Sequence, residues 1–359
     1  MEKYAVFWHN VTTKRRGGTS VNSFQRVMNR LQGKPVDRIP NLSIVMMFAA
    51  KELGVPYSDC CRDYRLLADA AFLCHERYGI DMVCAISDSL REAEGFGTEV
   101  IFPNEGVPYA AKLRLQNISD IDSLKVIDPS QSVRMSDTVE AVRLMRQRAG
   151  NDVPVVGWVE GALAESCDLM DMQQVFINLL DEPEVMHRLL DLCTKQGILF
   201  AKAQIEAGAH IMGIGDSAAS LVGPSLYEEF VLPYQQCLIG AMHEMGVPVK
   251  LHICGNIGPV MHLVAKTGAD MVDCDFMVDM ERAADILPAG TCICGNFNPV
   301  EVMYQGTPEM VKAEVRRCKT LSRRNHNFIA PGCEVPKDTP PENMLALLEA
   351  LLEGEHDEL

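Results

Sequence analysis

Residues 247–256 read VPVKLHICGN, and the pattern of this segment is the clearest indication of the fold class. Apolar and β-branched residues fill most of it, a helical pattern precedes it across a Gly-Val-Pro join, and Gly255 closes it. This composition predicts a buried β-strand that belongs to a βα unit of a parallel sheet. His252 and Cys254 stand at its carboxyl end, two residues apart, so their side chains point to the same face.

Other short apolar runs alternate with amphipathic helical patterns along the chain. The predicted strands are 39–46, 81–88, 153–161, 210–217, 247–255, 270–276, 291–298 and 327–334. Predicted helices include 184–207, 227–245 with a kink at Pro233, 310–321 and 341–352. Eight strands with eight crossovers predict an α/β protein of the (β/α)₈ TIM-barrel class.

The domain organisation follows from length and from the absence of any Ser/Gly/Pro-rich linker. With 359 residues, 47% of them hydrophobic, the chain can bury the core of one large barrel. A barrel of this class needs about 250 residues. The remainder is assigned to an N-terminal extension, 1–35, and to an insertion after the second strand, 94–128, within a single domain spanning 1–359.

Charge and cysteine content limit the function classes. The net charge of −16 argues against nucleic acid as a partner, because a phosphate backbone would be repelled. The thirteen cysteines are scattered and odd in number, which favours reduced thiols in the cytoplasm over a disulfide framework. The longest apolar run, 42–50, is too short to span a bilayer, so no membrane partner is expected. The closing letters HDEL, 356–359, are interpreted as chance.

His252 and Cys254 gain a third candidate partner in Cys333, within FIAPGCEVP. One imidazole and two thiolates are the ligand set of a catalytic zinc site, with one position open for water or substrate. The separation of 79 residues between the cysteines (333 − 254) excludes a zinc finger, which uses compact ligand pairs. In a barrel, Cys333 ends the eighth strand and therefore reaches the same rim as the other two.

Further polar residues follow the predicted strands and are expected on this rim. They are Asp88, Glu160, Asp216, Asp275, Asn296 and Asn298. Alternative interpretations stay open at this point. An isolated His or Cys in an apolar strand is more often a core residue than a ligand, and Cys292 and Cys294 form a rival Cys-x-Cys pair. Met46 and Met47 are core filler in the simplest interpretation, or they line an apolar pocket at the end of the first strand.

Several segments together resemble the uroporphyrinogen decarboxylase superfamily over roughly residues 20–355. They are HICGN, ADMVDCDFMVDM, CGNFNPV and APGCEVP, while GWVEGALAESCDLMDM is similar to a segment of its zinc-dependent methyltransferases of corrinoid systems. The resemblance implies that His252, Cys254 and Cys333 bind Zn²⁺. It also disfavours a decarboxylase, because residues 38–47 contain no cation beyond Arg38, where that branch holds a porphyrinogen with arginines.

The resulting hypothesis is a zinc-dependent methyltransferase that moves a methyl group from a small methyl ether to the Co(I) of a corrinoid protein. We find no Asp-x-His-x-x-Gly element, so the corrinoid is expected on a partner. The first alternative is methyl transfer from the corrinoid to a thiol such as coenzyme M. The others are a decarboxylase-like lyase and a non-catalytic zinc-binding barrel.

Roles for the remaining rim residues complete this hypothesis. Glu160 or Asp275 is expected to supply a fourth zinc ligand that substrate displaces, and Asp216 to donate a proton or orient the substrate. Met46, Met47 and Asn296 are expected to contact the substrate.

Overall fold

The computed structural model describes residues 21–321 and 326–353. Most of the predicted N-terminal extension, 1–20, therefore lies outside the described residues, as does the HDEL end. The described part of the extension contains helix α2 (Ser23–Leu31), which begins at an N-cap formed by Asn22. The Asn22 side chain accepts a hydrogen bond from the backbone N–H of Gln25, and the Gln25 side chain accepts one in return, a capping box.

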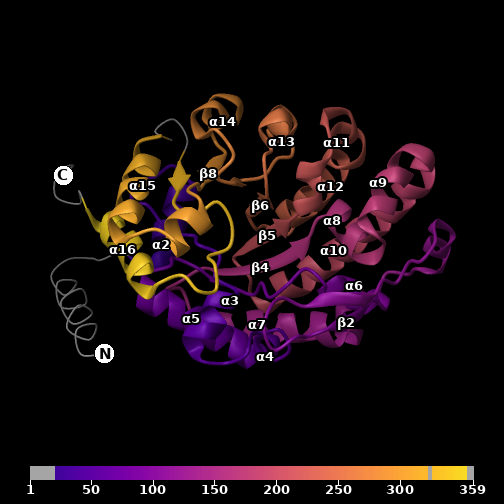
Figure 1. The fold of residues 1–359 in the computed structure, drawn as a ribbon, viewed down its shortest axis with the longest axis horizontal. Helices are drawn as coiled ribbons and strands as arrows, with labels where there is room; N and C mark the ends of the chain where they lie inside the picture. Colours follow the sequence, from indigo (N-terminus) through magenta and orange to yellow (C-terminus); the bar gives the residue numbers. More distant parts are fainter. Residues whose placement is uncertain (1–20, 322–325, 354–359) are drawn as a thin grey trace.

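A parallel sheet of seven strands forms the centre of the molecule, in the order β1-β4-β5-β6-β7-β8-β9 (Figure 1). Its strands are β1 (Val83–Cys84), β4 (Val155–Glu160), β5 (Ile211–Gly215), β6 (Val249–Ile253), β7 (Met271–Cys274), β8 (Cys292–Cys294) and β9 (Asn327–Phe328). Each lies within a predicted strand, and every neighbouring pair is parallel. The TIM-barrel class predicted from the sequence is confirmed.

The first predicted strand, 39–46, is largely wrong as a strand. Only Asn41 pairs, in a bridge to Ile329, although its carbonyl also accepts the N–H of Asp81 at 2.7 Å. This segment therefore lies between β9 and the residues just before β1. It takes the place of the eighth strand of the barrel. The Asn41 side chain accepts hydrogen bonds from the N–H and hydroxyl of Ser43, which turns the backbone away from a longer ladder.

Helices lie on the outside of the strands (Figure 1). They are α3 (Met47–Leu53), α4 (Tyr57–Cys60), α5 (Tyr64–Tyr78), α6 (Arg91–Phe96), α7 (Val133–Ala149), α8 (Ala162–Leu169), α9 (Met172–Asp181), α10 (Pro183–Ala207), α11 (Pro224–Phe230), α12 (Leu232–Glu244), α13 (Met261–Val264), α14 (Met280–Ile286), α15 (Pro308–Leu321) and α16 (Pro341–Leu352). The predicted kinked helix 227–245 is two helices, because the chain breaks at Val231 and Pro233 enters the first turn of α12.

The region 94–128 lies apart from the barrel sheet. Strands β2 (Glu99–Ile101) and β3 (Tyr109–Lys112) form an antiparallel pair of their own, followed by the 3₁₀ turn η2 (Ile118–Ser123). Helix α6, which leads into this pair, begins at Arg91, before the predicted boundary. The domain and insertion boundaries stay predictions.

The register of the sheet places interior residues in rows across neighbouring strands. One row contains Glu160, Gly215, His252, Asp273 and Cys294, since these pair in sequence from β4 to β8. Side chains paired in register share a face of the sheet. The row two residues earlier contains Trp158, Gly213, Lys250, Met271 and Cys292.

Gly213 and Gly215 make room inside the barrel for Trp158. A Cβ atom at Gly213 would overlap the indole ring, and one at Gly215 would lie 3.0 Å from its Nε1. The fully buried indole can therefore extend toward β6. Within the described residues, none of the helices combines the length and the apolar character needed to span a membrane.

Candidate metal centre

His252, Cys254 and Cys333 come together at the carboxyl ends of their strands. His252 is the fourth residue of β6, Cys254 follows that strand directly, and Cys333 lies five residues after β9. The Cys254 Sγ lies 3.0 Å from His252 Nε2 and 3.5 Å from the Cys333 Sγ, which is 3.8 Å from His252 Nε2. Three donor atoms from residues 81 positions apart (333 − 252) thus share one small space.

The donor set suits zinc. Within residues 21–321 and 326–353, these are the three His, Cys, Asp or Glu side chains whose ligand atoms lie close enough to hold one metal ion. His252 is buried and both cysteines are half-buried, so the sulfur side of the group remains accessible. Cys292 and Cys294, the rival pair, are buried inside the barrel and belong to no such group among the described residues. All thirteen cysteines are free thiols.

The three side chains shift one another's pKa values. The hydrogen bond from Cys254 lowers the pKa of Cys333 to about 4, and His252 lowers it further against the effect of burial. The same bond raises the pKa of Cys254 well above its usual range. Burial alone would lower the pKa of His252, but Asp273 and Cys333 raise it to about 9. Metal binding would therefore release protons.

His252 is held from behind by a carboxylate that the sequence hypothesis missed. Its Nδ1 lies 3.1 Å from Asp273 Oδ2, and the ammonium of Lys250 binds the same oxygen. Burial would raise the pKa of Asp273, but these two partners lower it to about 2. The signal was present in the sequence, because a lysine inside the apolar run VPVKLHI requires a buried partner.

Glu160 lies in the same interior row as His252, at the end of β4. Its Oε1 accepts a hydrogen bond from Arg91 at 3.2 Å, and its backbone N–H donates to Glu92 at 3.0 Å. Burial raises the pKa of Glu160 well above its usual range, although Arg91 opposes this effect. Burial thus favours the protonated form of Glu160, whereas the Arg91 guanidinium favours its carboxylate form.

Asp216 follows β5 and is almost fully buried. Its two carboxylate oxygens accept hydrogen bonds from the N–H of Ala164 at 3.1 Å and from the amide of Gln235 at 2.8 Å. Its backbone N–H donates to the carbonyl of His252 at 3.0 Å. Asp216 therefore connects α8 and α12 to the strand that carries the metal residue.

Asp275 and Asn296 lie together beside the Cys254 loop. Asp275 Oδ2 accepts the N–H of Gly255 at 2.9 Å, directly after Cys254. The Asn296 amide group donates to the carbonyls of Asp275 and Val278, at 2.9 and 2.7 Å. Both N–H bonds of Asn296 thus support the loop after β7, and only its oxygen is left for a substrate. Asn298, by contrast, caps the turn η6 (Pro299–Tyr304).

Met46 and Met47 do not end a strand, because α3 begins at Met47 with Met46 as its N-cap residue. The Met47 N–H donates to Glu334 Oε1 at 2.9 Å, and Glu334 is the neighbour of Cys333. Burial raises the pKa of Glu334 to about 7, and the charge of Cys333 raises it as well. Both methionines are half-buried, and the Met47 backbone thus binds the residue next to Cys333. Their contact with a substrate stays a prediction.

Asp88 lies outside this group. Its carboxylate pairs with the buried guanidinium of Arg134, which also binds Glu94 at 3.0 Å, and it accepts the N–H of Leu90. The structure thus uses Asp88 to hold the turn between β1 and α6.

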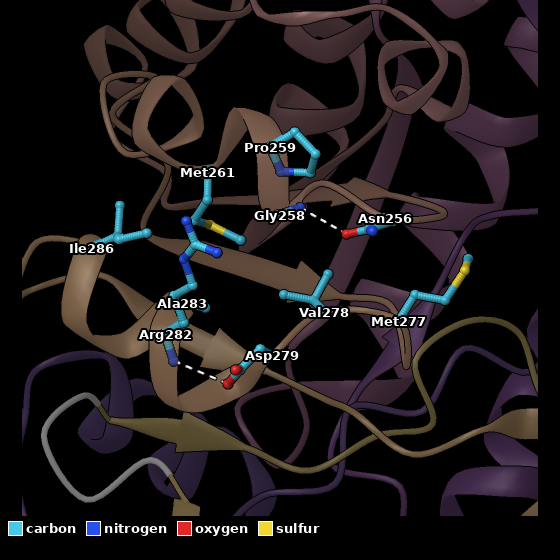
Figure 2. Close-up of a pocket in the computed structure, with 10 residues that line it drawn as sticks. All are labelled: Asn256, Gly258, Pro259, Met261, Met277, Val278, Asp279, Arg282, Ala283 and Ile286. Carbon is cyan, nitrogen blue, oxygen red and sulfur yellow. Dashed lines mark hydrogen bonds between the residues drawn. The ribbon is translucent and has the colours of Figure 1, made fainter.

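A groove of about 310 Å³ opens beside the metal centre, between the segment after β6 and helix α14. In Figure 2, Asn256 and Met277 lie at one end of it and Ile286 at the other, while the Arg282 guanidinium extends toward Met261. Asn256 is two residues beyond Cys254, and Met277 is two residues beyond Asp275. The groove therefore starts at the rim of the candidate metal site.

Comparisons with known proteins agree with the resemblance. The model of the uroporphyrinogen decarboxylase family (URO-D) matches residues 22–353. A methylcobamide:CoM methyltransferase of Methanosarcina acetivorans is 28% identical over 331 residues, which cover 90% of this chain and 96% of that protein. A uroporphyrinogen decarboxylase of Syntrophotalea carbinolica is 27% identical over 340 residues, 90% of this chain and 96% of its own. The solved structure of a methyltransferase from Methanosarcina mazei superimposes with a TM-score of 0.85 at 24% identity, covering 92% of this chain and 98% of that one.

Proposed function

Because the chain belongs to the uroporphyrinogen decarboxylase family, we propose that it is a zinc-dependent methyltransferase that works with a corrinoid protein. One observation carries the proposal: the Nε2 of His252 and the two cysteine Sγ atoms lie within 4.8 Å of one another at the carboxyl rim of the barrel. The relatives named methylcobamide:CoM methyltransferases support the corrinoid as the other methyl carrier.

The proposed metal site consists of His252, Cys254 and Cys333. Asp275 lies outside this group of three and is proposed as a fourth ligand that moves in when no substrate is bound. Bound zinc would supply a Lewis acid that stabilises the oxygen or sulfur anion present when the methyl group moves. Asp275 is suited to this exchange because its Oδ2 accepts only the Gly255 N–H beside the ligand loop, at 2.9 Å. Glu160 stays an alternative fourth ligand, although its Oε1 already accepts a hydrogen bond from Arg91.

The residues of the chain supply three further functions in this proposal. Glu160 delivers its proton to the leaving oxygen, since burial keeps its pKa high. Asp216 orients the rim by holding α8 and α12. Met46 and Met47 provide an apolar wall for the substrate, near Glu334 and Cys333, and Asn296 contacts the substrate through the side-chain oxygen that its two amide bonds leave over.

We assign the methyl-ether direction first, with Co(I) of the corrinoid as the acceptor. Two cations on or behind the barrel strands already pair with carboxylates, Arg134 with Asp88 and Lys250 with Asp273, and Arg91 donates a hydrogen bond to Glu160. An anionic thiol such as coenzyme M would therefore compete with these carboxylates for a cation, whereas a neutral methyl ether needs none. The names of the methanogen relatives favour the thiol direction, which is the second candidate.

The corrinoid-carrying partner would dock over the barrel mouth. Large apolar side chains are exposed on the loops after three strands: Leu221 is 61% exposed, Phe276 42%, Met277 49% and Val300 46%. Such side chains around a reaction site are suited to burial against a protein partner. A cytoplasmic location is part of the proposal and is supported by thirteen cysteines without a disulfide.

The decarboxylase alternative is less well supported. Arg38, the single cation of residues 38–47, donates to the buried carboxylate of Asp81 at 2.6 and 3.0 Å and is not free to hold an acidic substrate. A non-catalytic zinc barrel would close the fourth position, whereas both cysteines of this site are half-buried.

The decisive experiment combines the zinc-loaded protein with a reduced corrinoid protein and a panel of methyl ethers, and follows the cobalt absorbance. Conversion of Co(I) to methyl-Co(III) supports the first direction. Loss of methyl-Co(III) on addition of thiols supports the second. The proposal is contradicted if neither methyl transfer is observed and the protein instead shows lyase activity that chelators leave unchanged.

A further inference from the structure

Lys250 is a charged residue in the interior of the barrel. It stands two residues before His252 in β6, so both side chains point inward. Its side chain is 1% exposed, and its ammonium lies 5.7 Å from the centre of the Trp158 ring. Lysine is almost never fully buried unless it is paired, so a specific partner must hold this charge.

That partner is Asp273, and the contact has an unusual geometry. A single oxygen, Oδ2, binds both the Lys250 ammonium and the His252 Nδ1, the latter at 3.1 Å. The other oxygen, Oδ1, is buried and has no hydrogen-bond partner among the described residues. The orientation of the carboxylate is therefore set by two bonds to one atom.

We propose that Lys250 and Asp273 act as one positioning unit for the metal centre: Lys250 holds the Asp273 carboxylate so that it accepts the Nδ1–H of His252 and leaves Nε2 facing the two sulfurs. This inference rests on the zinc site of the proposed function and adds to it two residues that touch neither the ion nor the substrate. Partners of this kind fix the tautomer and ring orientation of a metal-binding histidine.

Lys250 is essential to this unit because it balances the charge of the Asp273 carboxylate and prevents that carboxylate from rotating. Without it, Asp273 would carry an unbalanced negative charge in the barrel interior and would keep one hydrogen bond of the two. The carboxylate could then rotate, since its second oxygen is held by no partner among the described residues. The Trp158 ring lies beside both residues: its centre is 6.3 Å from that of the His252 ring and 5.7 Å from the Lys250 ammonium.

The test is a double-mutant cycle with Lys250→Met, Asp273→Asn and the double variant, in the full chain. Zinc affinity is measured by competition with a chromophoric chelator, and metal geometry by the visible spectrum of the Co²⁺-loaded protein. Each single change should weaken zinc binding about 10- to 100-fold and alter the Co²⁺ spectrum. The double variant should bind zinc no more weakly than the weaker-binding of the two single variants. Both charges are removed together in it, and the introduced asparagine still offers an oxygen to Nδ1–H.

The outcomes separate positioning from a general effect on the barrel. Met271→Leu is the matched control, since Met271 pairs in register with Lys250 and carries no charge; this variant should keep wild-type affinity and spectrum. The proposal is overturned if the two single-variant losses of zinc affinity multiply in the double variant. It is also overturned if Lys250→Met keeps the wild-type zinc affinity and Co²⁺ spectrum. If Lys250→Met does not fold, Asp273→Asn is compared with the double variant, which must bind zinc at least as tightly. A wild-type protein that binds no zinc would instead refute the proposed function.

Discussion

The Sγ atoms of Cys254 and Cys333 lie 3.5 Å apart, although 79 residues separate the two cysteines (333 − 254). They meet because β6 and β9 are strands of one parallel sheet, whose carboxyl ends face the same rim. The sulfur pair is not a disulfide. This proximity is the geometry that the proposed zinc site requires of its two sulfur ligands.

Replacement of either cysteine should abolish zinc binding. Cys254→Ala or Cys333→Ala leaves two ligands, too few to retain the ion, so the zinc content should fall from about one per chain to near zero. Elemental analysis after dialysis measures this. Cys292→Ala is the control and should retain its zinc, because Cys292 is buried in the barrel away from the ligand group. Full zinc in both ligand variants would contradict the assignment.

Arg38→Met should destabilise the fold. The change removes a guanidinium from the fully buried carboxylate of Asp81, which keeps Arg26 at 2.8 Å as its remaining cation. Breaking a buried pair costs about 3 kcal/mol of unfolding free energy, which urea denaturation measures. Lys51→Met, which breaks the exposed pair with Asp338, should cost less than about 1 kcal/mol. Equal losses would argue against a structural role for Arg38.

Gly213→Ala and Gly240→Ala should change the free energy of unfolding in opposite directions. A methyl group at Gly213 overlaps the Trp158 ring, so the substitution should cost about 1–3 kcal/mol and weaken zinc binding through the contact of Trp158 with His252. Gly240 lies on the exposed side of α12 with open space around it, and alanine there should stabilise the protein by about 1 kcal/mol. Urea denaturation and chelator competition measure both variants. Tolerance at Gly213 would refute the packing role of Trp158.

The contribution of His210 to the stability of the protein should be lost as the pH is lowered from about 6.5 toward 4. Burial, together with Arg146, lowers the pKa of His210 to about 4, and the neutral ring accepts the N–H of Val155 on Nδ1 at 3.0 Å. An unfolded histidine has a pKa of about 6.5, so in this range the unfolded chain binds a proton that the folded one does not. The stabilisation is therefore present above pH 6.5 and is lost as the pH falls through the folded pKa.

His210→Asn provides the control for this effect. Its side-chain oxygen can accept the Val155 bond but does not titrate. Urea denaturation at several pH values should give a difference in unfolding free energy between the two proteins that is constant above pH 7 and declines toward pH 4. Parallel curves throughout would mean that His210 does not contribute.

Local sequence patterns were enough to predict the fold class of this protein and the edge of the barrel on which its candidate metal ligands lie. The alternation of apolar strands and helices predicted the barrel, and the polar residues at the strand ends predicted the rim on which His252, Cys254 and Cys333 meet. The first signal is the period of apolar residues, and the second is the type of residue at which a strand ends. Each can be recognised from residues that are close together in the chain. The rule that parallel strands present their carboxyl ends together then brings the distant cysteine to the site.

The tertiary structure alone decided which partner each of these side chains has. Lys250 binds Asp273, Arg91 binds Glu160, and Met46 precedes a helix beside Glu334, because partners on neighbouring strands depend on register and packing between segments far apart in sequence. Asn41 likewise pairs only once, since its own side chain bends the backbone. A periodic pattern specifies which face a residue occupies, whereas the identity of the group opposite it is a property of the assembled barrel.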